Sequence, residues 1–260
     1  MFRLFKFVAK TVILIKLMSL AFAAGVGAAY AVQARQLYRT WGLVAGGDER
    51  GVRGDDLVAD ADLVETRSID IDVPPAQVWP WIAQIGYGRG GWYSYAALDR
   101  PWAPSGGPQA ESADTVLNEY QDLAEGDLVP THPRGGFEAR VVEPGEALVL
   151  YLDDTMFREQ VEELMADAAD AVEEQGGEME MDSDWEMPPY RVSWAFELEE
   201  LPGGRTRLIE RLRARVEVSE AQWKAKPFAG MGVFVLMRSQ MLGIKERAEQ
   251  FEPVEPDEAA

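Results

Sequence analysis

The 260-residue sequence predicts an α+β fold in which an antiparallel sheet wraps around a long C-terminal helix, with a single transmembrane helix before it. Three observations lead to this prediction. The N-terminus has a long apolar run with basic residues around it, several later segments alternate apolar and polar residues, and the end has apolar residues at helical spacing. Alternation is typical of half-buried strands, and strands that follow one another through short turns favour an antiparallel sheet.

The N-terminal 40 residues differ in charge from the rest of the chain. They contain six basic residues and no acidic one, whereas the whole chain has a net charge of −20. The segment Thr11–Gln33 contains Lys16 as its one charge and exceeds the ~20 residues that a membrane-spanning helix needs. We therefore expect residues 1–40 to be a single-pass membrane anchor, with the folded domain on the extracytoplasmic side. A cleaved signal peptide is the alternative, because Ala21-Phe22-Ala23 has the small-x-small form of a cleavage site.

The chain between the anchor and the C-terminal helix contains the predicted strands. Residues 41–62 are rich in Gly, Asp and Arg and are interpreted as a linker. Alternation predicts the first strand at 68–73, and the proline pair after it favours the start of a helix whose apolar face includes Trp81. Further strands are predicted at 127–131, 137–142, 147–152, 190–198 and 208–216, with hairpin turns at Pro144-Gly145 and Pro202-Gly203-Gly204.

The last predicted helix covers residues 228–251. Its apolar face would consist of Phe234, Met237, Met241, Ile244 and Ala248. The tail at 253–260 contains two prolines and several acidic residues, and we expect it to be disordered.

An acidic insertion is expected at 153–187. Residues 153–186 include fourteen acidic residues and one basic residue, Arg158. Helical spacing of apolar residues predicts an amphipathic helix in its first half, and the second half is expected to be flexible. The insertion is interpreted as solvated, with recruitment of a protein partner as the alternative.

Composition excludes several kinds of chemistry. The chain has no cysteine, so neither a thiolate site nor a disulfide can form, and one histidine, His132, cannot make a histidine-rich metal centre. The acidic balance argues against nucleic acid as a partner. We expect no metal and no cofactor, and we expect His132 to be exposed and inert in a loop.

Five short motifs resemble segments of the START-like superfamily (SRPBCC, the polyketide cyclase/dehydrase and lipid-transport group). They lie in the order Ile69–Trp81, Gly88–Tyr95, Tyr120–Asp127, Ser193–Phe196 and Met241–Glu249. The resemblance covers about residues 60–250, so we place the START-like domain at 63–252, interrupted by the acidic insertion. It implies a helix-grip fold with a cavity for a hydrophobic ligand between the sheet and the last helix.

Candidate ligand-binding residues follow from this implied cavity. Trp194 and Phe196 have the inward-facing parity of their strand, and Met237 and Met241 lie on the apolar face of the last helix. Trp81 and an aromatic cluster are further candidates, the cluster either at the cavity entrance or against the membrane surface: Trp92, Tyr93 and Tyr95. Ordinary core packing is the alternative for each of them.

Glu210 is a candidate of another kind. It lies between Leu208 and Leu212 on the apolar side of its strand, where an unpaired carboxylate is strongly unfavourable. It is therefore interpreted as a polar anchor for a ligand, as an acid/base group, or as one half of an internal ion pair with a partner such as Arg140 or Arg191. The other side of the same strand carries five arginines, for which we expect ion pairs on a solvated face or, alternatively, a basic stripe for anionic headgroups: Arg205, Arg207, Arg211, Arg213 and Arg215.

These observations lead to a functional hypothesis. The protein is expected to bind a hydrophobic small molecule or lipid while tethered to a membrane, without any required catalysis. A cyclase or dehydratase that uses Glu210 is the first alternative, and an interaction module that uses the acidic insertion is the second.

Overall fold

The computed structural model describes residues 41–43, 50–94, 112–132, 135–160, 188–217 and 226–251, with the backbone alone at 226–229 and 231. The chain divides into two units, Met1–Leu43 and Val44–Ala260. The predicted span Thr11–Gln33 lies outside the described residues. Within the described ranges, no helix combines the length and the apolar character that crossing a membrane requires.

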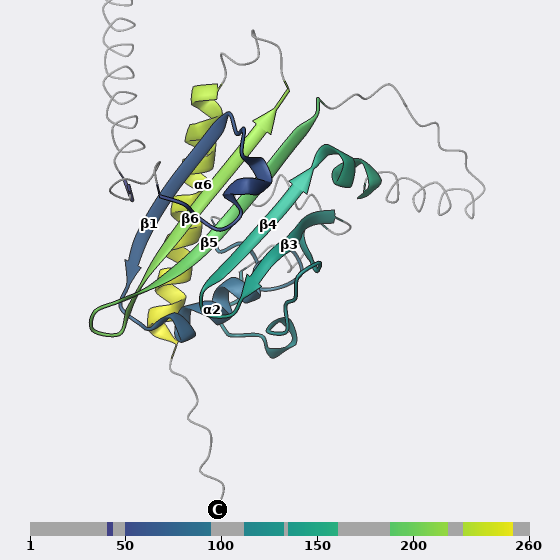
Figure 1. The fold of residues 1–260 in the computed structure, drawn as a ribbon. Coiled ribbons are helices and arrows are strands. Elements are labelled where there is room, and N and C mark those ends of the chain that lie inside the picture. The colour runs from purple at the N-terminus through teal and green to yellow at the C-terminus, as the bar shows by residue number, and fades with distance from the viewer. Residues whose placement is uncertain are drawn as a thin grey trace, which may run out of the picture. The chain divides into compact units, whose positions relative to one another are not determined.

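The second unit is an α+β fold. Its described elements are η1 (Asp55–Val58), β1 (Leu63–Ile71), α2 (Pro75–Ala83), η3 (Asn118–Tyr120), β2 (Leu128–His132), β3 (Gly135–Glu143), β4 (Ala147–Asp153), β5 (Tyr190–Leu201), β6 (Arg205–Val216) and α6 (Lys226–Gln250). The strands form one six-stranded antiparallel sheet in the order β1-β6-β5-β4-β3-β2 (Figure 1). The first strand therefore pairs with the last, and the remaining strands pair with their neighbours in sequence.

The helix α6 covers one face of this sheet, which we call the inner face (Figure 1). The five apolar residues predicted for the helix's buried face, Phe234, Met237, Met241, Ile244 and Ala248, are all buried. Pairing in register places Leu208, Glu210 and Leu212 of β6 on the inner face, beside Leu198, Phe196 and Trp194 of β5. The predicted α+β arrangement of sheet and C-terminal helix is thus confirmed.

The first strand is longer at its start than predicted. β1 begins at Leu63 rather than residue 68, and it pairs with β6 from Leu63 opposite Ala214 to Ile71 opposite Thr206. Two of its inner-face positions are charged, Glu65 and Arg67. Because these residues replace apolar ones on the buried side, the alternation that marks a strand is absent from this stretch of sequence.

Residues 41–62 were expected to form a linker, and this expectation is wrong for residues 50–58. Residues 50–58, which we call the outer-face segment, pack on the sheet face opposite α6. Val52 is buried against Val149 of β4 and Ala195 of β5, with Leu57 beside them. The few apolar side chains in this Gly-, Asp- and Arg-rich stretch have no regular spacing, so periodicity does not reveal their burial.

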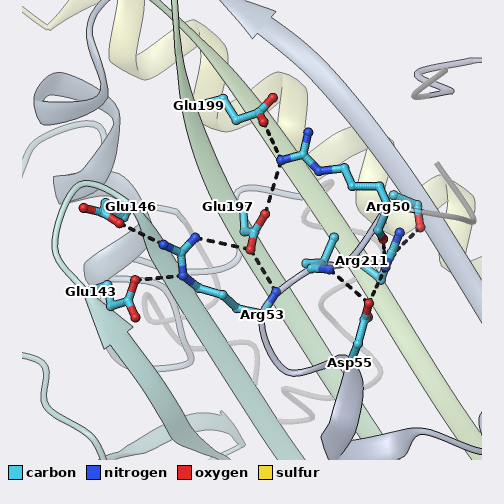
Figure 2. A network of polar contacts seen from close by, with 10 residues as sticks. Arg50, Arg53, Asp55, Glu143, Glu146, Glu197, Glu199 and Arg211 are labelled. Atoms are coloured by element: carbon cyan, nitrogen blue, oxygen red, sulfur yellow. Dashed lines mark hydrogen bonds and ion pairs between the residues drawn. The ribbon is translucent and has the colours of Figure 1, made fainter. Parts of the chain in front are cut away.

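The outer-face segment also contributes an ionic network (Figure 2). Arg211 of β6 is 2% exposed, and its guanidinium donates to Asp55 Oδ2 at 2.6 Å, to the Arg50 carbonyl at 2.8 Å and to Thr66 Oγ1 at 2.9 Å. The Arg53 guanidinium reaches Glu197, Glu143 and Glu146, and Arg50 pairs with Glu199 and Glu197. The solvated face expected for the β6 arginines is therefore wrong at Arg211, because the outer-face segment covers it.

The other arginines of β6 agree better with the ion pairs on a solvated face that the sequence predicts. Arg207 forms a bidentate ion pair with Asp70 of β1, with N–O distances of 2.7 and 3.0 Å, and both side chains are half-exposed. Arg215 pairs with Asp62 at 2.9 Å, and Arg213 donates to the carbonyls of Val58 and Ala59. Each of these arginines is thus engaged by groups of its own domain.

The start of the acidic insertion is helical, as predicted. Residues 154–160 form a helix, and Asp153 Oδ1 accepts from the Met156 amide at 2.9 Å, as an N-terminal cap does. The Gln160 carboxamide donates to the Gly136 carbonyl and accepts from the Gly136 amide of β3. Residues 161–187 lie outside the described part of the chain.

Candidate functional site

An aromatic cluster lies on the inner face. The indole of Trp92 stacks on that of Trp194, with centroids 5.4 Å apart and planes 4° from parallel, and Trp194 stacks on Phe196 at 5.3 Å. Phe137 of β3 meets Trp92 and Trp194 edge-on, at 6.4 and 6.1 Å. The structure thus brings together three predicted site residues from β5 and from the loop after α2. Phe137 was not among the predicted ligand-binding residues, although it begins the strand predicted at 137–142.

Met237 and Met241 supply the corresponding surface of α6. Both side chains are fully buried, together with Phe234 and Ile244 of the same helix face. Their predicted burial is confirmed, and their contact with a ligand stays a prediction. Unbranched methionine side chains adapt readily to the shape of a neighbouring molecule.

Trp81 and Tyr93 form a second cluster, with the C-terminal end of α6. The Trp81 ring meets Tyr93 edge-on at 6.1 Å and Phe251 at 5.9 Å, and the Arg247 guanidinium lies 5.2 Å above the Tyr93 ring. Burial raises the pKa of the Tyr93 hydroxyl, which accepts a hydrogen bond from Gln84. These contacts agree with core packing of both residues. Tyr95 lies outside the described residues.

Gln84 joins two of the motifs on which the family resemblance depends. Its carboxamide nitrogen donates to the Tyr93 hydroxyl at 2.8 Å and to the Thr115 carbonyl at 3.1 Å. Its carboxamide oxygen accepts from the Leu117 amide at 2.8 Å and from Gln121 at 3.3 Å. Gln84 was not among the predicted site residues. The signal in the sequence was its polar side chain between two apolar residues, Ile82 and Ile85, which are buried. Gln84 fixes the loop that carries Trp92 against α2.

The same loop touches α6 at Gly243, and this contact yields a prediction. A Cβ on Gly243 would lie 2.9 Å from the Cβ of Tyr93 and against the Tyr93 carbonyl, whereas a Cβ on Gly232 of the same helix would meet nothing within 4 Å. We expect Gly243→Ala to lower the free energy of unfolding by about 1–3 kcal/mol. Gly232→Ala, the control, is expected to raise it by up to about 1 kcal/mol. Urea unfolding followed by tryptophan fluorescence measures both, and equal effects of the two substitutions would contradict the close contact.

Glu210 is the most unusual residue of the inner face. Its side chain is fully buried, and neither carboxyl oxygen has a hydrogen-bond partner among the described residues. Burial raises the pKa of Glu210 well above its ordinary value, and the nearby Trp194 indole lowers it in part. Burial favours the neutral acid form of this carboxyl group, which can donate as well as accept a hydrogen bond.

The ion-pair partners expected for Glu210 are wrong. Arg140 pairs with Glu138 at 3.1 Å, and Arg191 pairs with Asp60 at 3.0 Å. Arg191 lies opposite Arg215 in register, so it is on the outer face, away from Glu210. Of the three interpretations of Glu210, the two that remain are a polar anchor and an acid/base group.

A second charged group is buried on the inner face beside Glu210. Arg67 of β1 lies directly opposite Glu210 in register, but its guanidinium pairs with Glu65 at 2.9 Å and donates to the Thr66 carbonyl at 2.8 Å. It also lies 5.9 Å from the centre of the Phe234 ring. Arg67 was not among the predicted site residues, because its strand was predicted to begin one residue later, at residue 68.

Gln240 adds a polar group from α6. Its side chain is fully buried, and neither its carboxamide nitrogen nor its oxygen has a hydrogen-bond partner in the described part of the chain. The same holds for the indole nitrogen of Trp194. Buried polar atoms almost always have partners, so these groups are candidates for hydrogen bonds to a bound molecule or to buried water.

Metal binding has no support in the described ranges. They contain no group of three or more His, Asp or Glu side chains that could hold a metal ion. His132 was expected to be exposed in a loop, and this is wrong: it ends β2, is half-buried and meets Phe157 edge-on at 6.5 Å. Burial lowers the pKa of the imidazole.

Comparison with known proteins gives similarity of structure only. No protein-family model and no curated protein matches the chain. Among solved structures, protein MLL2253 from Mesorhizobium loti is 16% identical, with a TM-score of 0.32 over 70% of this chain and 98% of that one. Hypothetical protein jhp0584 from Helicobacter pylori is 12% identical, with a TM-score of 0.37 over 74% of this chain and 95% of that one. These values support no argument about function.

Proposed function

We propose that the domain is START-like and binds a hydrophobic small molecule or lipid between the inner face of the sheet and α6. The observation that carries the proposal is Glu210, a fully buried carboxyl with both oxygens unpartnered, among aromatic and methionine side chains. Binding sites for small molecules are mostly apolar and have a few placed polar groups. The inner face has this composition.

The aromatic stack supports the same proposal. Trp92 comes from a loop rather than from the sheet, and it is half-buried while its stacking partner Trp194 is buried. A ring at this position can cover an apolar molecule and move aside to admit it without disturbing the sheet. We further propose that residues 1–40 tether this domain to a membrane, on the extracytoplasmic side.

Co-purification tests the binding proposal. The full chain is extracted in mild detergent, washed and analysed by mass spectrometry for bound apolar molecules. We expect the wild type and the outer-face control Arg205→Met to retain such a molecule, and Met237→Trp to lose it, because the indole would fill space beneath α6. Urea unfolding shows that each variant is folded, and Met241→Trp replaces Met237→Trp if the latter is not. Absence of any bound molecule from wild type produced in several hosts would contradict the proposal.

An enzyme remains the second candidate, because the raised pKa of Glu210 suits a general acid. A cyclase or dehydratase of this kind would alter the co-purified molecule itself. Loss of the mass of one water on incubation with wild type, but not with Glu210→Gln, would favour the enzyme over the carrier.

A further inference from the structure

Three of the buried polar groups that have no hydrogen-bond partner in the described part of the chain belong to three different elements. Glu210 lies on β6, Trp194 on the neighbouring strand β5, and Gln240 on α6. Gln240 follows Met237 by three residues and precedes Ile244 by four, and all three side chains are fully buried, so they lie on one helix face. Glu210 and Trp194 thus lie on the inner face of the sheet, and Gln240 lies on the buried face of the helix that covers it.

Their hydrogen-bonding capacity is that of neutral groups. An indole nitrogen only donates, a carboxamide donates and accepts, and a carboxyl group in its acid form does both. An alcohol or ketone oxygen is complementary to this set, since it accepts from Trp194 and Glu210, and a hydroxyl can also donate to Gln240.

The charges around these groups disfavour an anionic ligand. A buried carboxylate or phosphate needs a cation beside it. The buried inner-face cation nearest in register, Arg67, already pairs with Glu65. Among the described residues no ion pair reaches Glu210, and the remaining arginines of β6 lie on the outer face. In register beside Glu210, an anion would thus meet a carboxyl group and an arginine that is already paired with a carboxylate. On α6, the half-buried Arg238 is engaged in interactions of its own.

We infer that the molecule bound beneath α6 is neutral and carries an alcohol or ketone oxygen, which hydrogen-bonds to Glu210 and Trp194, with Gln240 as the polar contact from the helix. This inference rests on the proposed function and deepens it, because it selects among apolar ligands. Fatty acids and phospholipids are disfavoured by it, and fatty alcohols, sterol-like alcohols and ketones are favoured.

A matched pair of probes tests the inference. The full chain is titrated at pH 7 with 1-decanol and with decanoate, which have the same chain length but differ in charge, and binding is followed by the fluorescence of the stacked tryptophans. We expect 1-decanol to bind at least about 10-fold more tightly than decanoate, the factor that corresponds to ~1.4 kcal/mol. Glu210→Leu and Gln240→Leu are each expected to weaken 1-decanol about 3- to 10-fold, the effect of one lost hydrogen bond. Glu210→Gln, which still donates and accepts, keeps the preference.

The outcomes separate the inference from the proposed function. Equal binding of both probes, or tighter binding of decanoate, would overturn the inference and leave apolar binding intact. Binding of neither probe would overturn both, together with the absence of any co-purified molecule. Because Gln240→Leu removes a group on another element, it gives an independent result if Glu210→Leu fails to fold.

Discussion

Replacement of Arg211 with methionine is expected to lower the free energy of unfolding by about 3 kcal/mol. The substitution keeps most of the side chain's apolar volume and removes a guanidinium that makes three hydrogen bonds, to Asp55, to the Arg50 carbonyl and to Thr66. The Asp55 carboxylate would then lose its shortest ion pair in a place that the outer-face segment partly shields from water.

Arg205→Met provides the control for this prediction. Arg205 lies on the same face of β6, but its side chain is 43% exposed and its carboxylate partner Asp72 is 4.0 Å away. Exposed ion pairs contribute little, so this loss is expected to be below about 1 kcal/mol. Both values come from urea unfolding of the full chain. Similar losses in the two variants would show that burial by the outer-face segment does not strengthen the Arg211 contacts.

Glu210 is expected to give the protein an unusual dependence of stability on pH. Burial raises the pKa of Glu210 in the folded state, so the folded protein keeps a proton that the unfolded chain releases near its ordinary pKa of ~4.3. The contribution of this proton to stability is complete below the unfolded pKa. It is lost as pH rises toward the folded pKa, at about 1.4 kcal/mol per pH unit.

The variant Glu210→Gln isolates this effect. Glutamine has nearly the same shape and does not titrate, while the other ionisable groups, including the Glu65–Arg67 pair, are common to both proteins. We therefore expect the variant to gain stability relative to wild type as the pH rises from 5 toward the folded-state pKa of Glu210, as measured by urea unfolding at each pH. A difference that does not change with pH would mean that Glu210 is paired or solvated in the folded protein.

The strands and the last helix could be predicted because their signals are local. Alternation in 190–198 and helical spacing from Phe234 to Ala248 both reflect burial on one side of an element. The turn residues at Gly145 and Gly203 adopt positive φ, which glycine allows without strain. The outer-face segment and the start of β1 could not be predicted, because their burial depends on partners more than a hundred residues away in sequence, such as Ala195 and Arg211.

Strand alternation predicts which residues of the sheet belong to the candidate site. It does not predict whether Glu210 has an ion-pair partner. Parity along one strand places Trp194 and Phe196 inward, and parity along another places Glu210 inward. Parity also places Arg191 outward, so the residue could have been excluded as a partner of Glu210. For Arg140 the register shifts between Ala139 and Val141, and parity across such a bulge is unreliable. Gln240 has no local signal, because one polar residue on an apolar helix face is common.

The outer-face segment has a mechanical consequence. Tension applied to the chain at residue 50 reaches Arg50, Arg53 and Asp55 before it reaches β1, and these residues form ion pairs with β3, β5 and β6. Contacts arranged in this way share a load instead of failing one after another. When the chain is pulled from its N-terminal side, the outer-face segment is therefore expected to bear the load first and to protect the pairing of β1 with β6, and with it the position of Glu210.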